Sequence, residues 1–275
     1  MRSDLTLAAR PARAIRHDPE RDIPRWSALG LFGLWVLVVG PMAALALGLA
    51  PILIDRHPEA NPGLIFWGTI ICGMAWQTVV SVGVLVSEGQ SWTSDALRRS
   101  LWLAAPRWHR SGRRAWSVLW LAVPLGAFFT LSTDVALEGL TAFLDAHLPA
   151  WLTPDYGDVR RLATPENTGN WTIVWLMLIS SVFNYILGEA FFFHGILLPR
   201  MAVTFGRWGW VVNAVAFGGY HVHKAAMIPV LMLSCLTFSL PSQLTRSIWP
   251  ALILHGLEGL IGITLLLYVV LGGLS

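Results

Sequence analysis

Apolar runs alternate with short polar segments along nearly the whole chain after residue 26. The long apolar stretches lie at about residues 28–54, 63–86, 115–137, 171–199, 208–221, 225–240 and 248–270. A helix needs about 20 apolar residues to cross roughly 30 Å of hydrocarbon. The pattern therefore predicts an all-α, polytopic bundle of about seven transmembrane helices, within a range of six to eight. The fifth and sixth helices are the shortest.

The composition agrees with this pattern. Hydrophobic residues make up 55% of the 275 residues, charged residues make up 13%, and the mean hydropathy is +0.59. These values lie far outside the range of soluble globular proteins. We expect an integral membrane protein whose residues 27–275 form one membrane domain, with no room for a second sizeable domain.

The distribution of arginine predicts the orientation of the bundle. Residues 1–26 carry six arginines, and Arg200 and Arg207 follow the fourth apolar stretch. Positive residues resist translocation, so residues 1–26 are predicted to be a cytoplasmic basic tail, and the fourth helix to end in the cytoplasm. The net charge of +3 is explained by such flanks. We therefore expect a lipid bilayer, a bacterial cytoplasmic membrane, as the surroundings, and no nucleic-acid partner.

Several ionisable residues stand inside or at the ends of the later apolar stretches. They are Glu189, His194, His221, His223, His255 and Glu258. A charged group in hydrocarbon costs roughly 2.5 to 3.5 kcal/mol on insertion scales, so it is retained for function or paired with another polar group. At about 1.5 Å per residue, Glu189 lies roughly 16 Å from Arg200, and His255 roughly 14 Å from Arg246. His221 lies roughly 21 Å from Arg207.

The similar depths of Glu189, His221 and His255 on three helices favour one shared polar site. In such a site a glutamate could activate water while a neighbouring histidine holds or transfers the proton. The same three residues form a plausible ligand set for zinc with an open position for water. They could equally be a set of hydrogen bonds that hold the helices together. Depth alone leaves these interpretations open.

Three segments of the last hundred residues resemble the motifs of a known family. They are GEAFFFHGILLPRM at 188–201, FGGYH at 217–221 and SIWPALILHGLEG at 247–259. They resemble the CAAX prenyl endopeptidase and bacteriocin-processing family of intramembrane proteases, also called the Abi family. The resemblance implies a protease-like core at about residues 171–270. In that family two adjacent glutamates precede an arginine, and Phe-x-x-x-His and His-x-x-x-Asn follow.

The matched positions imply roles for individual residues. Glu189 matches the first glutamate, Phe217 and His221 match the second motif, and His255 matches the histidine of the third. The resemblance implies that Glu189 activates a water with help from His221, either directly or through a zinc ion. It also implies that His255 stabilises the oxyanion formed when the scissile carbonyl is attacked.

Three positions depart from the family pattern. Ala190 stands at the second glutamate, His194 at the arginine and Gly259 at the asparagine. Positions 190 and 194 share a helix face, so the family's residues there would form an ion pair, and the two replacements are coupled. Glu258 follows His255 by three residues and could replace the missing carboxylate, or it could bridge near a glycine-rich kink.

Two further polar residues are candidates for supporting roles. Asn213 precedes His221 by eight residues on the same helix face and could orient it or bridge helices. His223 closes the fifth apolar stretch and is predicted to lie at the mouth of the site.

The sequence thus supports three functions in order. The first is an intramembrane endopeptidase that uses glutamate-activated water near the cytoplasmic half of the bilayer. Its partner would be a peptide or protein substrate, membrane-associated or prenylated proteins included. The second is an impaired pseudoprotease that acts as a membrane binding or immunity protein, which the three departures support. The third is a transporter with a proton relay, which explains the buried ionisable residues but not the motif order.

Overall fold

The computed structural model describes residues 23–108 and 111–273. The predicted basic tail at residues 1–26 therefore lies almost wholly outside the described residues. The described chain contains no strand and folds into helices. The α-helices are α1 (Ala28–Ala43), α2 (Ala50–Arg56), α3 (Pro62–Ser87), α4 (Ser94–Ser100), α5 (Val118–His147), α6 (Trp171–Ser181), α7 (Leu198–Phe205), α8 (Gly209–Tyr220), α9 (Ile228–Ser234), α10 (Leu236–Thr245) and α11 (Trp249–Val270).

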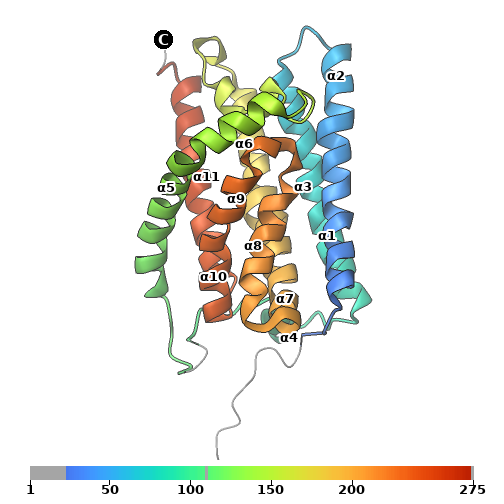
Figure 1. Cartoon of the computed structure of the whole chain (residues 1–275), viewed down its shortest axis with the longest axis vertical. Coiled ribbons are helices and arrows are strands. Elements are labelled where there is room, and N and C mark those ends of the chain that lie inside the picture. The colour runs from blue at the N-terminus through green and yellow to red at the C-terminus, as the bar shows by residue number, and fades with distance from the viewer. Residues whose placement is uncertain (1–22, 109–110, 274–275) are drawn as a thin grey trace, which may run out of the picture.

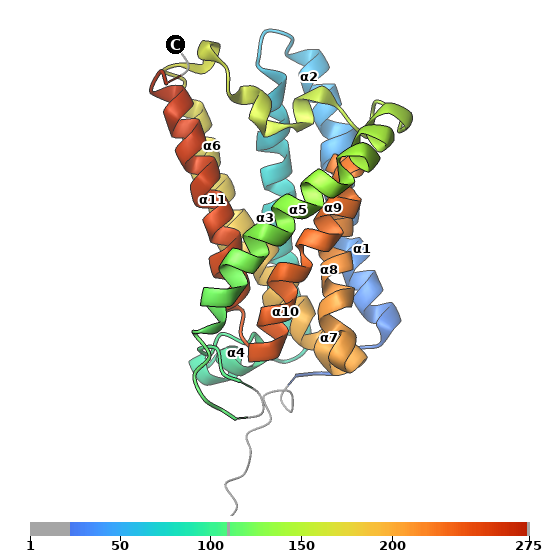
Figure 2. The same cartoon turned by 60° about the vertical axis from the view of Figure 1, so that its left-hand side comes forward.

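The helices form an elongated bundle, as Figures 1 and 2 show. Within the described residues, six continuous helical stretches are long and apolar enough to cross a membrane. One of them, Trp171–Tyr220, is 50 residues long and turns back at Gly206, whose φ of +57° suits glycine. Beyond this turn α8 packs against α7. The chain therefore passes along the bundle seven times, and the predicted all-α membrane bundle is confirmed.

The two ends of the bundle carry different segments. The short helix α4 lies at the end where α7 and α10 finish and where the described chain begins (Figures 1 and 2). The C-terminal end of α11 and the connection at residues 148–170 lie at the opposite end. Because the predicted cytoplasmic tail precedes residue 23, the α4 end is the predicted cytoplasmic face.

The third long helix differs from its predicted boundaries. We predicted a helix that ends near residue 137, whereas α5 runs on to His147. The polar residues between 138 and 147 include good helix formers, and glycine at 139 alone does not stop a helix. The helix ends where Leu148 takes an extended conformation before Pro149, because a residue before proline disfavours the helical conformation.

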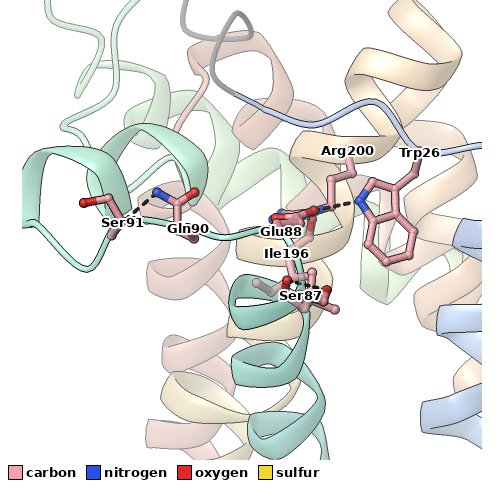
Figure 3. A network of polar contacts seen from close by, with 8 residues as sticks. Trp26, Ser87, Glu88, Gln90, Ser91, Ile196 and Arg200 are labelled. Carbon is pink, nitrogen blue, oxygen red and sulfur yellow. Dashed lines mark hydrogen bonds and ion pairs between the residues drawn. The ribbon is translucent and has the colours of Figure 1, made fainter.

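A buried ion pair holds the predicted cytoplasmic end together (Figure 3). We expected Arg200 to be a cytoplasmic flank, but its side chain is fully buried in α7 and forms an ion pair with Glu88, which follows α3. Its Nε donates to Glu88 Oε1 at 2.8 Å, and its Nη1 donates to the Ile196 carbonyl at 2.8 Å. Trp26 Nε1 also donates to Glu88, at 2.7 Å. The expectation failed because it did not consider Glu88 as a partner.

Candidate active site

Glu189 lies at a break in the long helical stretch that contains α6 and α7. A π-helical segment, Val182–Leu187, ends at Gly188, and a second one, Phe191–Leu197, follows. A Cβ at Gly188 would lie 2.6 Å from the Met74 carbonyl oxygen of α3, so only glycine lets the chain approach α3 this closely. Segments of π-helix are frequent at functional sites. The break places Glu189 in the interior, with 5% of its surface exposed.

His221 faces Glu189 from the end of α8. Its Nε2 lies 3.9 Å from Glu189 Oε2. Its Nδ1 lies 3.0 Å from the Phe217 carbonyl oxygen. A carbonyl can only accept, so Nδ1 carries the hydrogen of this bond, and the neutral ring presents the lone pair of Nε2 to the carboxylate. Two acceptors thus face each other, an arrangement that suits a shared proton or a water that donates to both.

His255 of α11 is buried among aromatic rings beside this pair. Its ring meets Tyr185 edge-on at 4.8 Å between centroids and stacks on Phe238 at 5.4 Å. The Phe217 ring lies 5.7 Å from that of His255 and 5.4 Å from that of His221. The three histidine and glutamate residues matched by the family motifs therefore gather in one region, with Phe217 contacting both histidines.

The expected zinc ligand set does not fit this geometry. In the part of the chain that the structure describes, no group of three histidine, cysteine, aspartate or glutamate side chains could hold a metal ion. The aromatic rings around His255 account for this, because they hold its imidazole apart from the Glu189 and His221 pair. Glu189, His221 and His255 are therefore not treated as metal ligands below, and no step is derived through a metal.

The two coupled departures from the family pattern are both buried. Ala190 and His194 have no exposed surface. Within the described residues neither ring nitrogen of His194 has a hydrogen-bond partner. The His194 ring instead meets the Phe217 ring edge-on at 5.5 Å. An unpaired buried polar group costs about 1 to 3 kcal/mol, so His194 is retained here at the expense of stability.

The third departure, Gly259, is covered by Tyr185. A Cβ at position 259 would lie 2.3 Å from Cε2 and 2.7 Å from Cζ of the Tyr185 ring. The phenol end of Tyr185 therefore occupies the space into which an asparagine side chain at 259 would extend. Sequence analysis missed Tyr185 because its position depends on the π-helical segment, which a regular helical period does not predict.

Glu258 does not share the environment of His255. His255 is buried, whereas Glu258 is exposed. Three residues correspond to a rotation of roughly 300° around a helix, so the two side chains diverge by roughly 60°. The charge of Glu258 nevertheless interacts with those of Glu189 and Lys224. Glu258 therefore lies beside the site.

Asn213 joins helices and does not contact His221. Its Nδ2 donates to the Phe193 carbonyl at 2.7 Å, and its Oδ1 accepts from Ser239 Oγ at 2.8 Å. The His221 Nδ1 hydrogen that Asn213 could have oriented is used by the Phe217 carbonyl. Of the two roles considered, the bridging role is the one that these contacts support.

His223 and Tyr220 flank His221 in sequence and in space. The His223 ring lies 5.7 Å from the His221 ring, and its Nδ1 has no hydrogen-bond partner within the described residues. The buried Tyr220 hydroxyl lies toward both Glu189 and Gln77, although neither pair meets the geometry of a hydrogen bond. Sequence analysis assigned no role to Tyr220 or Gln77; the position of Tyr220 directly before His221 was the available signal.

The structure thus defines a membrane-embedded helical bundle with a buried glutamate and histidine pair. Residues 170–261 match the family model described as type II CAAX prenyl endopeptidase Rce1-like, and this part of the chain is an Rce1-like domain. The match confirms the family resemblance read from the motifs. Searches of curated proteins and of solved structures found no match.

Proposed function

We propose that this protein is an intramembrane endopeptidase that hydrolyses a peptide bond with a water activated by Glu189. The observation that carries the proposal is the distance of 3.9 Å between Glu189 Oε2 and His221 Nε2 within the Rce1-like domain. This distance exceeds a direct hydrogen bond, and a polar contact of this length can be bridged by a water. A water in that position donates to both acceptors.

The reaction needs one proton to be taken up and returned. Glu189 accepts a proton from the water as the water oxygen attacks the scissile carbonyl carbon. The protonated Glu189 then gives this proton to the leaving nitrogen, and the carbon–nitrogen bond breaks. His221 holds the water through Nε2, while its Nδ1 bond to Phe217 fixes the ring. The products are one new carboxyl terminus and one new amino terminus.

Two groups near the pair can stabilise the oxyanion. His255 lies across the Phe217 ring from His221. The Tyr185 ring contacts His255, and its phenol end occupies the space above Gly259. We propose that the Tyr185 hydroxyl serves as the donor that the family pattern assigns to an asparagine at 259. Removal of one such donor typically costs about 10²-fold to 10³-fold in rate.

A second candidate function is a binding protein that keeps the fold without cleavage. The observation in its favour is the buried His194, which lacks any hydrogen-bond partner within the described residues, next to Ala190. At these positions the family pattern has an arginine and a glutamate. A bundle that has lost this ion pair could still hold a peptide in the membrane.

A quantitative survey of peptide termini separates the two candidates. Membranes are compared from cells that express the wild-type protein, Glu189→Gln, His221→Ala or Glu258→Gln at matched abundance. New termini that vanish in the first two variants and persist in Glu258→Gln support the peptidase and identify its substrate. Identical profiles in all four, from folded protein, favour the binding protein.

A further inference from the structure

A crevice outside the candidate active site lies toward the C-terminal end of the bundle. It is formed by the C-terminal half of α5, the segment at residues 153–161, and residues 223–230. In Figure 2 this half of α5 reaches the end of the bundle at which the connection 148–170 lies. The volume of the crevice is about 860 Å³. Ligand pockets in proteins span about 300 to 1,000 Å³, so the crevice is large enough for a peptide segment.

The crevice is strongly acidic. Asp134, Glu138 and Asp145 of α5 line it, and their helical positions lie within roughly 40° of one another, so they form one face of the helix. Asp155 and Asp158 line it from the facing segment. Carboxylates on a membrane-spanning helix face the bundle interior or a water-filled cavity, because exposure to lipid is costly. The crevice supplies such a cavity for the α5 carboxylates.

Basic groups do not balance this charge. Arg161 and Lys224 are the two lysine or arginine side chains that line the crevice, against five carboxylates. Arg161 is already paired with Asp155, at 2.7 Å. The remaining carboxylates create a negative potential in a concave space, where such fields are focused.

A buried polar side chain points to a ligand independently of the charge. His223 lines the crevice, only 4% of its surface is exposed, and its Nδ1 has no hydrogen-bond partner within the described residues. An unpaired buried donor or acceptor is costly, and a ligand that hydrogen-bonds it would recover that cost.

The shape of the acidic face selects the kind of cation. The described residues contain no group of carboxylates that could hold a metal ion, so the charges are too dispersed for a point charge. From Asp134 to Asp145 the helix rises by roughly 16 Å. An extended peptide covers this distance with about five residues, at roughly 3.3 Å each. Two basic residues about four or five positions apart would therefore meet both ends of the acidic face.

We propose that this crevice binds an extended peptide segment that carries at least two lysine or arginine residues. The floor of the crevice lies next to the candidate active site, because His223 contacts the His221 ring and the charge of Lys224 interacts with that of Glu189. The inference deepens the proposed function, since it names the charge of the segment that lies beside the scissile bond. It is tested by binding alone, so its failure is distinguishable from a failure of hydrolysis.

The experiment uses the full-length protein in nanodiscs of zwitterionic phosphatidylcholine. The probe is a fluorescent nine-residue peptide with arginine at positions 3 and 7 and serine elsewhere, and a peptide with glutamine at both positions is the neutral comparison. Glu138→Gln/Asp145→Asn removes two crevice carboxylates. Glu59→Gln/Glu166→Gln removes two exposed carboxylates outside the crevice and is the matched control. Affinity is measured at several salt concentrations, and folding is checked by thermal unfolding.

We expect the arginine peptide to bind at least tenfold more tightly than the glutamine peptide, with an affinity that falls as salt rises. The Glu138→Gln/Asp145→Asn variant should lose at least tenfold in affinity and much of the salt dependence, whereas the control stays within twofold of wild type. Equal losses in both variants would attribute binding to general surface charge and overturn the proposal. Equal affinities for the two peptides would overturn it as well.

Discussion

The ring of Tyr185 lies against Gly259, so closely that a Cβ at 259 would be 2.3 Å from its Cε2. The two residues stand on different helices, 74 positions apart, and the same tyrosine meets His255 edge-on at 4.8 Å. The glycine and the tyrosine are therefore coupled. The loss of a side chain at 259 creates the space in which the phenol end of Tyr185 lies beside the candidate active site.

The Tyr185 hydroxyl is predicted to act in the chemical step. Tyr185→Phe keeps the ring on Gly259 and removes the donor. We expect kcat to fall by about 10²-fold to 10³-fold, with KM within about threefold of wild type, because the lost bond forms in the transition state. Steady-state kinetics on a substrate from the termini survey checks this. An unchanged kcat would assign Tyr185 a packing role only.

A second prediction concerns the coupling of positions 185 and 259. Gly259→Asn alone should lower both stability and activity, because the new side chain collides with the Tyr185 ring. Tyr185→Ala/Gly259→Asn frees the space and supplies an amide donor, so its activity should exceed that of either single variant. A double-variant cycle on kcat/KM measures the coupling. Additive losses would show that the two positions do not share this space.

The buried Glu88 and Arg200 pair is predicted to stabilise the bundle. Glu88→Gln leaves the fully buried Arg200 without a carboxylate, which should cost about 3 to 5 kcal/mol of unfolding free energy. Glu88→Gln/Arg200→Met should recover part of this loss. The exposed Asp155 and Arg161 pair gives the comparison, since Arg161→Gln should cost less than about 1 kcal/mol. Unfolding in mild detergent measures all three, and equal losses for Glu88→Gln and Arg161→Gln would refute the prediction.

Asn213 is predicted to act on stability and not on catalysis. Asn213→Ala leaves the Phe193 carbonyl and the Ser239 hydroxyl without their partner, at a cost of about 1 to 3 kcal/mol. Below the unfolding temperature kcat should stay within about threefold of wild type, because His221 is held by the Phe217 carbonyl. Thermal unfolding and kcat are measured on the same preparation. A loss of kcat without a loss of stability would instead support an orienting role.

The bundle could be predicted from the sequence because its signal is redundant. Each membrane pass needs about 20 apolar residues, and the apolar runs alone gave the all-α bundle. The boundaries were harder where polar residues continue a helix, as in α5 up to His147. Arg200 was misassigned because its partner, Glu88, is 112 positions away, and tertiary ion pairs leave no local pattern.

The candidate site was predicted in part. The depth of Glu189 and His221 placed them together, and the structure brings their side chains to 3.9 Å. The contribution of Tyr185 could not be read from spacing, because the π-helical segment Val182–Leu187 and Gly188 change the helical register before Glu189. Glu258 was placed too near His255, since a shared helix face tolerates a divergence of roughly 60°.

Isotope labelling tests the central claim that Glu189 activates a water. Purified wild-type protein, Glu189→Gln and Glu258→Gln are reconstituted in nanodiscs and given a substrate from the termini survey in H₂¹⁸O. We predict one ¹⁸O in the new carboxyl terminus for the wild type and for Glu258→Gln. The rate for Glu189→Gln should be lower by about 10²-fold or more, with unfolding unchanged. Cleavage by folded Glu189→Gln at the wild-type rate would contradict the account.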